Sequence, residues 1–244
     1  MNVLALSTST PRGSVAIVSG DRLLAEAAHD DPRGHAEHLF ALVDDVLARA
    51  SLGRSDLGLV ACDIGPGSFT GVRIAVASAK GIAVGLGAPL AGVVSLEAMA
   101  VEAVGALDPR EGTIVASAID AKKGELYVAV HEVGPAGVVT LSPPAHVPIA
   151  EAARLVIEAV GDRPFVSVAD VASFVDFACI AGRARPERAL VATPSAAWIG
   201  RIAARRAPFP VEGASEIVPL YVRAPDAVPS PSGTTGPLAM LPAR

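Results

Sequence analysis

The order of hydrophobic patterns along the first half of the chain restricts its fold more than any other feature. Short apolar runs separated by turn residues come first, and they predict three antiparallel strands. From His35 the apolar residues recur every three or four positions, which is the spacing of an amphipathic helix. The elements expected in this part are strands at 2–6, 14–19 and 22–28, a helix at 35–50, a strand at 57–62, a helix at 69–86, a strand at 89–94 and a helix that Ser95 caps. This order predicts an α/β lobe.

A second, looser round of the same patterns begins near Glu111. It contains expected strands at 113–119 and 126–131, a turn at 120–125, a helix at 149–160 and a helix at 194–206 with Thr193 as its N-cap and Pro194 as its first residue. Three strands followed by alternating helices and strands are the layout of a lobe in the actin-like ATPase superfamily (the ASKHA, ribonuclease H-like fold). We therefore expect two lobes with mixed sheets, the second reduced. The expected division is 1–105, 106–223 with a last part that returns to the first lobe, and a disordered tail rich in Pro, Ser and Gly at 224–244.

Composition places the chain among compact soluble proteins and argues against a basic nucleic-acid binder. Hydrophobic residues make up 51% of the sequence, charged residues 18%, and the formal net charge is −5. The N-terminus has no basic region before its apolar run, and the apolar stretch at 74–86 is short and contains Lys80, so we expect neither a signal peptide nor a membrane span. The two cysteines, Cys62 and Cys179, indicate no disulfide framework or zinc site, and we expect a cytoplasmic protein.

The most distinctive stretch is DIGPGSFTGVRI at 63–74, between an expected strand and an expected helix. It is not a Walker phosphate-binding loop, because no lysine follows Gly71. It is not a nucleophile elbow either, because Pro66 and Thr70 stand where that motif has glycines around Ser68. Glycines permit a tight turn, and Ser68 or Thr70 can cap the following helix. The residues therefore predict a close connection from a strand into a helix.

The same stretch carries a resemblance to a known family. GPGSFTGVRI, continuing into AKGIAVGLGAPLAGVVSLEAMA, resembles the signature region of the TsaB (YeaZ) family, a subunit of the bacterial machinery that makes N6-threonylcarbamoyladenosine in tRNA. VLALSTSTPRGSVAIV, HAEHLFALVDDVL, IDAKKGELYVAV and PLYVRAP are similar to further segments of that family. The resemblance spans about residues 1–224 and is thin between Gly134 and Pro210.

The resemblance implies a non-catalytic subunit. The TsaB family is a paralogue of TsaD, which transfers the threonylcarbamoyl group and holds a metal with the two histidines of an H-x-E-G-H helix start. The corresponding residues are Ser95 and Met99 here, and neither is a good ligand for a divalent metal. The family usually has an acidic residue at the position of Ser7, and Ala169 and Val171 stand where a glycine turn would approach a phosphate. We therefore expect no metal and no cofactor, with at most weak ATP or ADP binding at the residues of the opening hairpin: Ser7, Thr8, Ser9 and Thr10.

The resemblance also implies partners. This chain would pair with TsaD, join TsaE in a larger complex, reach tRNA indirectly and form a homodimer when alone. The transfer would go from threonylcarbamoyl-AMP to N6 of adenosine 37 in tRNAs that read ANN codons. The first two helices form the contact surface in TsaB-like proteins, and the resemblance implies the same here. The helix at 69–86 is apolar on most faces, which fits a helix shared with a partner and equally a well-covered core helix. The residues expected at this interface are His35, Leu39, Phe69, Val72, Arg73, Val76, Ala79 and Lys80.

Three alternatives stay open beside this interpretation. A nucleotide-dependent kinase or ATPase of the same fold would bind ATP with Mg²⁺ at least in the millimolar range and would lose turnover when Ser7 or Thr8 is changed. A glycoprotease-like peptidase would need a metal pair or a nucleophile, for which no motif is present. A homodimer that binds some other protein would share the interface and differ only in the partner.

The remaining polar residues are interpreted as structural. His35 and His38 are expected at a solvated helix end, with no third histidine near them, and His29 and His131 are taken as structural. Asp44 and Asp45 should diverge because adjacent helical residues point apart. Lys122 and Lys123 are expected on a hairpin turn, where they could contact tRNA phosphates.

Overall fold

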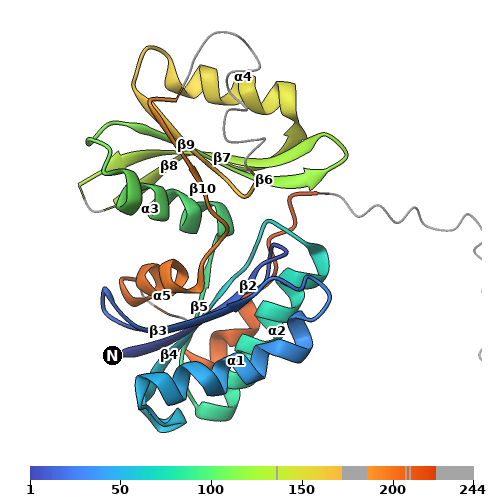
Figure 1. Ribbon diagram of the computed structural model, residues 1–244, viewed down its shortest axis with the longest axis vertical. Helices are drawn as coiled ribbons and strands as arrows, with labels where there is room; N and C mark the ends of the chain where they lie inside the picture. The colour runs from blue at the N-terminus through green and yellow to red at the C-terminus, as the bar shows by residue number, and fades with distance from the viewer. Residues whose placement is uncertain (136, 172–185, 207, 209, 224–244) are drawn as a thin grey trace, which may run out of the picture.

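A computed structural model describes residues 1–135, 137–171, 186–206, 208 and 210–223, so Cys179 and the expected tail at 224–244 lie outside the described residues. The chain forms two five-stranded sheets with helices on both faces of each (Figure 1). Its elements are β1 Asn2–Ser7, β2 Gly13–Ser19, β3 Arg22–His29, α1 His35–Ala50, β4 Leu57–Asp63, α2 Phe69–Leu86, β5 Leu90–Val93, α3 Ser95–Leu107, β6 Ile114–Lys122, β7 Glu125–Gly134, β8 Gly137–Pro148, α4 Ile149–Val160, β9 Phe165–Ala169, β10 Arg188–Val191 and α5 Ala196–Ala204, with 3-10 turns at Arg54–Asp56 and Val211–Glu216.

The first lobe is built on the sheet β3-β2-β1-β4-β5. β1, β2 and β3 pair antiparallel, and β4 and β5 continue the sheet in parallel from β1, so the sheet is mixed. α1 and α2 cover one face, where residues such as Leu39 and Val76 complete a core with Leu4 and Leu6 of β1. α5 covers the other face. Both faces of β1 and β4 are therefore buried, which explains their nearly continuous apolar runs.

The second lobe repeats this design on the sheet β10-β9-β6-β7-β8. α4 covers one face of this sheet and α3 the other. α3 and α5 lie in contact between the two sheets (Figure 1), and an ion pair between Glu97 and Arg206 joins α3 to the end of α5. The chain passes from β10 in the second lobe directly to α5 on the first, which connects the lobes a second time.

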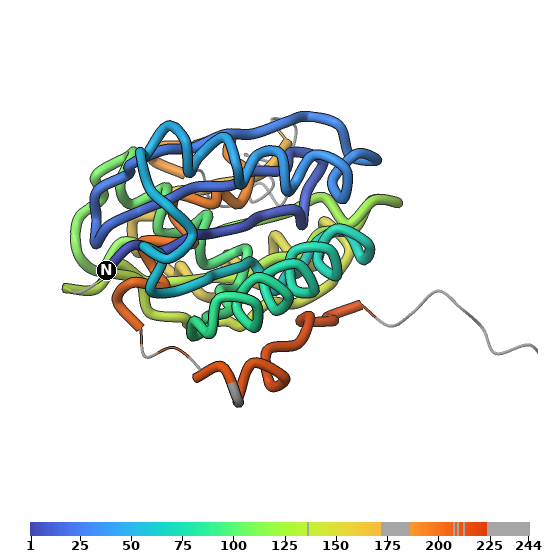
Figure 2. Tube along the Cα trace, turned by 90° about the horizontal axis from the view of Figure 1, so that it is seen from below, coloured from blue at the N-terminus to red at the C-terminus, as the bar shows by residue number. Residues whose placement is uncertain are grey.

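Residues 210–223, here called the closing segment, run along α2 of the first lobe (Figure 2). The amide of Leu220 donates to the carbonyl O of Ile64 at 2.7 Å, and Lys80 Nζ donates to the carbonyl O of Ser215 at 3.2 Å. Ile217 is buried in the core beneath α2. One flank of α2 is therefore covered by the chain's own C-terminal part.

Several sequence predictions are confirmed, and others need correction. The bounds predicted for α1, α2 and α4 are those observed. The last helix begins at Ala196 instead of Pro194, because the Ser195 side chain caps it by accepting from the amide of Ala197 at 3.2 Å. Ser95 is the first residue of α3 and not its cap. The sequence interpretation missed β8, β9 and β10: β8 contains Pro143 and Pro144, which weaken a strand pattern.

α2 is long and apolar enough to pass a composition test for a membrane span, and it is the one such helix among the described residues. The apolar stretch at 74–86, which was expected to be too short for a span, is part of this longer helix. The helix packs on the sheet of the first lobe through Val72, Ala75 and Val76. A core helix passes the same test, so the finding is weak evidence for a membrane.

Glu102 lies on α3, the helix that contacts α5 between the two sheets, and its burial there can be tested. Burial, and secondarily the charge of Glu26, raise its pKa to about 7, and Glu102 Oε2 has no hydrogen-bond partner among the described residues. The folded-state pKa lies above the unfolded value, so the stabilisation from the neutral acid is complete below pH ~4.5 and is lost as the pH rises through 7. Glu102→Gln should therefore raise the free energy of unfolding by about 1–3 kcal/mol at pH ~8.5 and change it little at pH ~4.5.

Urea unfolding at the two pH values measures this difference. The matched control is Glu37→Gln on the exposed side of α1, which should have no comparable effect at either pH. An equal gain from Glu102→Gln at both pH values would show that the carboxylate is not the destabilising group.

Candidate functional site

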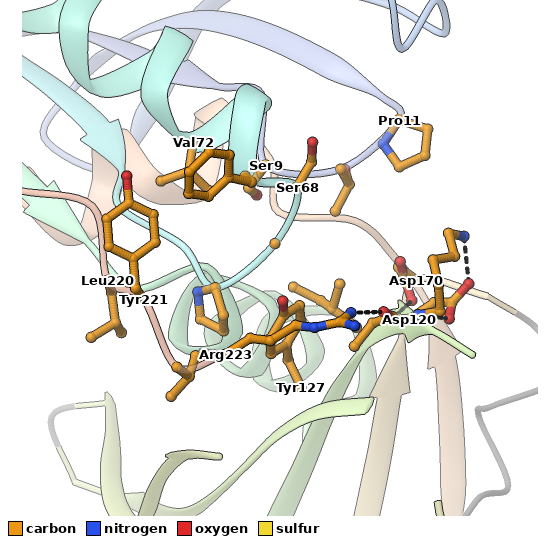
Figure 3. Close-up of a pocket in the computed structure, with 18 of the residues that line it drawn as sticks. Ser9, Pro11, Ser68, Val72, Asp120, Tyr127, Asp170, Leu220, Tyr221 and Arg223 are labelled. Atoms are coloured by element: carbon orange, nitrogen blue, oxygen red, sulfur yellow. Dashed lines mark hydrogen bonds and ion pairs between the residues drawn. The ribbon is translucent and has the colours of Figure 1, made fainter. Parts of the chain in front are cut away.

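A cleft of about 880 Å³ opens between the lobes. The loop after β1 and the start of α2 line it from the first lobe, β6, β7 and Asp170 line it from the second, and the closing segment forms one side (Figure 3). Among its lining residues are Ser9, Thr10, His35, Gly67, Ser68, Phe69, Arg73, Asp120, Lys122, Asp170, Tyr221 and Arg223.

The structure brings only part of the predicted nucleotide-binding set to the cleft. Ser9 and Thr10 line it, whereas Ser7 and Thr8 do not. Ser7 Oγ lies 2.9 Å from Asp63 Oδ2 and 2.8 Å from the carbonyl O of Pro194, and Thr8 Oγ1 donates to the carbonyl O of Gly71 at 2.7 Å. Both hydroxyls are fully buried and hydrogen-bonded within the protein, so neither is presented to a phosphate.

The glycine-rich stretch brings the start of α2 into close contact with the loop that follows β1. The amide of Ser68 donates to the carbonyl O of Ser9 at 2.6 Å, and the Ser68 side chain caps α2 by accepting from the amide of Gly71 at 3.3 Å. A Cβ at Gly67 would lie 2.3 Å from the carbonyl O of Ser9, and one at Gly71 would lie 1.9 Å from that of Thr8. Glycine is thus required because the backbone of the loop after β1 lies where a side chain would stand.

Asp63 supplies a buried carboxylate beside Ser7. Ser7 itself stands at the position where the resemblance to the TsaB family implies an acidic residue. Asp63 Oδ2 also lies 3.3 Å from the amide of Ser9, which donates to it, and Asp63 Oδ1 has no hydrogen-bond partner among the described residues. Burial raises the pKa of this carboxyl above its usual range, although the bonds from Ser9 and Ser7 oppose that shift. The sequence interpretation took Asp63 only as the start of the glycine stretch. Its role depends on the pairing of β1 with β4, which the sequence alone does not show.

Two further carboxylates face the cleft from the second lobe, and the sequence interpretation had not singled them out. The amide of Asp120 donates to Asp170 Oδ1 at 2.9 Å, and Lys122 Nζ pairs with Asp120 Oδ2 at 2.5 Å. Burial raises the pKa of Asp170 to about 6. Each aspartate lies at or just after the end of a strand, β6 or β9, and these two strands are parallel neighbours. That signal becomes visible only once β9 is recognised as a strand.

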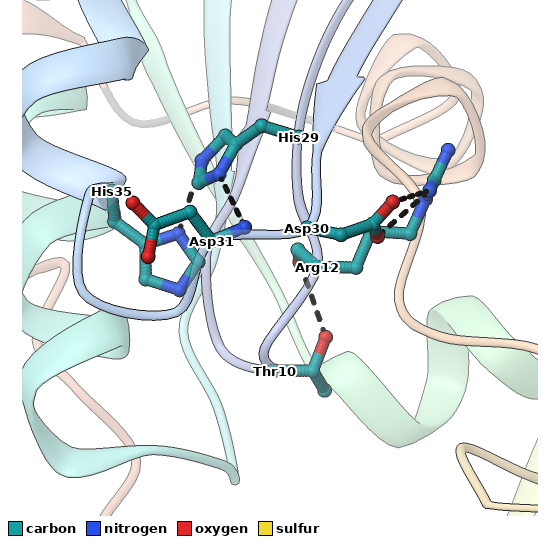
Figure 4. A network of polar contacts seen from close by, with 6 residues as sticks. All are labelled: Thr10, Arg12, His29, Asp30, Asp31 and His35. Atoms are coloured by element: carbon teal, nitrogen blue, oxygen red, sulfur yellow. Dashed lines mark hydrogen bonds and ion pairs between the residues drawn. The ribbon is translucent and has the colours of Figure 1, made fainter.

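Three histidines, His29, His35 and His38, come together at the start of α1, and His35 lines the cleft. His35 is buried, which corrects the expectation of a solvated position, whereas His38 is exposed as expected. His35 is 3% exposed, and its Nδ1 lies 3.2 Å from Nε2 of His29, whose ring also lies 4.8 Å from that of His38. The amide of Asp31 donates to His29 Nδ1 at 3.2 Å, so the proton of the neutral His29 ring is on the nitrogen that faces His35 (Figure 4). Burial lowers the pKa of His35, and the neighbouring His29 lowers it further.

The histidines meet because β3 ends at His29, beside the start of α1 at His35. The spacing of the residues in the sequence did not predict how the turn between these two elements folds. A Cβ at Gly13 would lie 2.4 Å from His29 Nε2, so this glycine gives the pair its space. His131 lies elsewhere, buried in β7, where burial lowers its pKa to about 4. Among the described residues, no group of three His, Cys, Asp or Glu side chains could hold a metal ion.

The two positions that correspond to metal ligands in TsaD point into the protein. Ser95 Oγ donates to Ser9 Oγ at 3.2 Å and is fully buried. Met99 is fully buried in the core between α3 and the second sheet. Both positions are thus occupied by internal contacts.

The surface of α1 and α2 differs from the predicted interface. Five of the predicted interface residues are buried within the first lobe: His35, Leu39, Val72, Val76 and Ala79. The four apolar ones lie on the sides of α1 and α2 that pack on the sheet. They cannot contact a partner directly. The exposed side of α2 instead carries small and apolar residues, and α1 exposes Phe40. These exposed residues, here called the outer strip, are Phe40, Ala77, Gly81, Val84 and Gly85. Phe40 and Val84 are 55% and 63% exposed.

The three other predicted interface residues contact the closing segment. Arg73 Nε donates to the hydroxyl of Tyr221 at 2.7 Å, and its guanidinium lies 3.6 Å from the ring centroid of Phe69. Lys80 donates to a backbone carbonyl of the same segment. Phe69 and Arg73 are exposed at the cleft, whereas Lys80 is partly covered.

The remaining expectations can be placed briefly. Asp44 and Asp45 diverge to separate ion pairs, with Arg54 at 2.9 Å and with Arg49. Lys122 and Lys123 form the β6–β7 turn with φ of 66° and 58°, so the backbone is left-handed there. Ala169 ends β9, and Cys62 is buried, which raises the pKa of its thiol far above the usual range.

Three comparisons place this architecture among known proteins. Residues 23–168 match the family model TsaD: tRNA N6-adenosine threonylcarbamoyltransferase. The TsaB protein of Escherichia coli is 37% identical over 54% of this chain and 55% of its own length. The TsaB protein of Bacillus subtilis is 30% identical over 54% of this chain and 56% of its own length. The chain thus spans about half the length of the curated relatives that it matches.

Solved structures extend the likeness to the whole fold. YeaZ from Pseudomonas aeruginosa is 26% identical and covers 90% of this chain and 99% of its own, with a TM-score of 0.71. A second Pseudomonas aeruginosa structure, described as similar to peptidase YeaZ, is 28% identical and covers 91% of this chain and 99% of its own, with a TM-score of 0.75. Component A of the (R)-2-hydroxyglutaryl-CoA dehydratase of Acidaminococcus fermentans covers 88% of this chain and 99% of its own at a TM-score of 0.50 and 13% identity, which shows the shared fold alone. The fold is that of the actin-like ATPase superfamily, as predicted, and the chain belongs to the TsaD family, in which the relatives that it resembles are TsaB (YeaZ) proteins.

Proposed function

We propose that this chain acts in the synthesis of N6-threonylcarbamoyladenosine in tRNA, as a non-catalytic subunit that pairs with TsaD. The relatives from Escherichia coli and Bacillus subtilis are described as tRNA threonylcarbamoyladenosine biosynthesis proteins, which supports this process for the present chain. In this proposal TsaD performs the transfer from threonylcarbamoyl-AMP to adenosine 37, and TsaE joins the larger complex. The chain's own contribution is to hold TsaD in its active arrangement.

The observation that carries the proposal is the outer strip. A helix that is apolar on most sides needs a cover on each of them. The sheet and the closing segment cover two sides of α2, and the side with Ala77, Gly81 and Val84 stays exposed. Small residues there let a partner helix approach closely, and Phe40 and Val84 provide apolar area for it.

The non-catalytic assignment is supported by the buried polar residues. Ser95 and Met99 replace the expected metal ligands and are packed internally. Ser7 and Thr8 are bonded to the protein's own atoms, and the cleft presents the carboxylates of Asp120 and Asp170, which disfavour a polyphosphate. These features support a subunit that does not itself turn over a nucleotide.

A reconstituted assay tests the function. Purified TsaD and TsaE of the same organism, supplied with tRNA, ATP and threonylcarbamoyl-AMP, should form threonylcarbamoyladenosine at least about tenfold faster when this chain is added, as mass spectrometry of digested tRNA would measure. This chain with TsaE but without TsaD should form none. Equal product with and without the chain, or product from the chain without TsaD, would contradict the proposal.

A further inference from the structure

The cleft rim carries an aromatic and cationic cluster, formed by Phe69, Arg73 and Tyr221, none of which belongs to the outer strip. The rings of Phe69 and Tyr221 lie 5.4 Å apart between centroids, tilted by 37°. Each residue is 51% exposed, so one side of the cluster packs on the protein and the other faces solvent. Aromatic residues are 4% of this sequence, and two of them are exposed here side by side.

Arg73 gives the cluster a charge that can act on a ligand. Its guanidinium stacks on Phe69 at 3.6 Å from the ring centroid and lies 5.7 Å from that of Tyr221. In the part of the chain that the structure describes, Arg73 makes no ion pair, and its one side-chain hydrogen bond there goes to the neutral hydroxyl of Tyr221. A stacked guanidinium with no carboxylate partner is suited to a planar base and to a phosphate.

Further cations lie along the same cleft. Lys122 is on its second-lobe side and 71% exposed at the side chain, and Arg223 lies beyond Tyr221 on the closing segment. Their positive charges are partly neutralised, because Lys122 pairs with Asp120 and Arg223 lies 3.9 Å from Glu125. The positive charge is therefore concentrated at the rim, while Asp120 and Asp170 make the second-lobe wall acidic.

We propose that the Phe69–Arg73–Tyr221 cluster binds an unpaired base of a single-stranded RNA segment, an inference that rests on the proposed function for its RNA substrate. An exposed base stacks on the Phe69–Arg73 surface, and the adjoining phosphate contacts Arg73 from outside the cleft. A strand fits better than a free nucleoside polyphosphate, because its phosphates stay at the cationic rim and away from the aspartates. Stacking of this kind tolerates any base, so the contact adds affinity without reading sequence.

The test uses the full chain and a labelled single-stranded RNA of about ten nucleotides in fluorescence anisotropy. Arg73→Gln and Phe69→Leu should each weaken binding at least about tenfold, and Phe69→Trp should retain it. The matched control is Arg201→Gln: Arg201 also stacks on an aromatic ring, 4.4 Å from the centroid of Trp198, but on α5. It should bind RNA as the unchanged chain does. Circular dichroism of each variant verifies the fold.

Three results would overturn the inference. The first is that the unchanged chain does not bind RNA, and the second is that Arg201→Gln loses as much RNA affinity as Arg73→Gln. The third is that AMP competes as strongly as unlabelled RNA, which would assign the cluster to a free nucleotide. The association of each variant with TsaD is measured in parallel. TsaD binding without RNA binding overturns this inference alone, whereas RNA binding without TsaD binding overturns the proposed function alone.

Discussion

Gly71→Ala is expected to lower the free energy of unfolding by more than about 3 kcal/mol, a large part of the stability of a typical domain. The new Cβ would lie 1.9 Å from the carbonyl O of Thr8, and no rotamer change can relieve a clash between backbone and Cβ. The carbonyl O of Gly71 also accepts the hydrogen bond from Thr8 Oγ1, so any shift that makes room breaks this bond. Urea unfolding measures the loss directly.

The same helix offers a matched control. Gly81 is also inside α2, and a Cβ there would meet nothing within 4 Å. Gly81→Ala should therefore stabilise the protein by about 0.5–1 kcal/mol, because alanine has the higher helix propensity. If Gly71→Ala and Gly81→Ala had the same effect, the close approach of the loop after β1 to α2 would not be the reason for glycine in this stretch.

Val84→Glu is expected to weaken the association with TsaD at least about 100-fold and to leave the chain folded. Val84 is 63% exposed on the outer strip, so the charge costs little in the free chain but would be buried without a counter-ion in the complex. Titration calorimetry measures both dissociation constants, and urea unfolding verifies that stability is retained.

Val139→Glu is the control for this prediction. Val139 is 58% exposed, which is similar to Val84, but it lies on β8 of the second lobe. Its substitution should leave the association with TsaD unchanged. If both variants bound TsaD equally well, the outer strip would not be the contact surface, and if both lost binding equally, the effect would be one of charge alone.

The periodic helices and the antiparallel start of the first lobe could be predicted because their patterns are local. α1 and α2 each bury a continuous apolar face on one sheet, which fixes the three-and-four-residue repeat in the sequence. β9 was missed for the opposite reason. FVSVA at 165–169 is a short strand, fully buried on both faces, and such a run is not distinguishable from other apolar segments by periodicity.

The interface prediction shows why an apolar residue is a poor guide to a surface. Val72, Val76 and Ala79 were assigned to a partner because the helix has apolar residues on most sides, but they are its core-facing side. On the exposed side, Ala77, Gly81 and Gly85 accompany Val84, and these three small residues carry little hydrophobic signal. Arg73 and Lys80 were expected at the partner interface, and both contact the closing segment, which could not be located from sequence.

The cleft residues could not be predicted as a group because they are far apart along the chain. Asp120 and Asp170 meet through the pairing of β6 with β9, and Tyr221 reaches Arg73 through the closing segment. The glycine stretch, in contrast, was correctly interpreted as a tight connection into a capped helix, since turn and cap signals are local.

The association of this chain with TsaD tests the central claim most directly. Light scattering after size-exclusion chromatography should be recorded for the chain alone, for TsaD alone and for their mixture at micromolar concentrations. The proposed function predicts a one-to-one heterodimer in the mixture, which Val84→Glu abolishes and Val139→Glu preserves. Two separate species in the mixture, with both proteins shown to be folded, would contradict it.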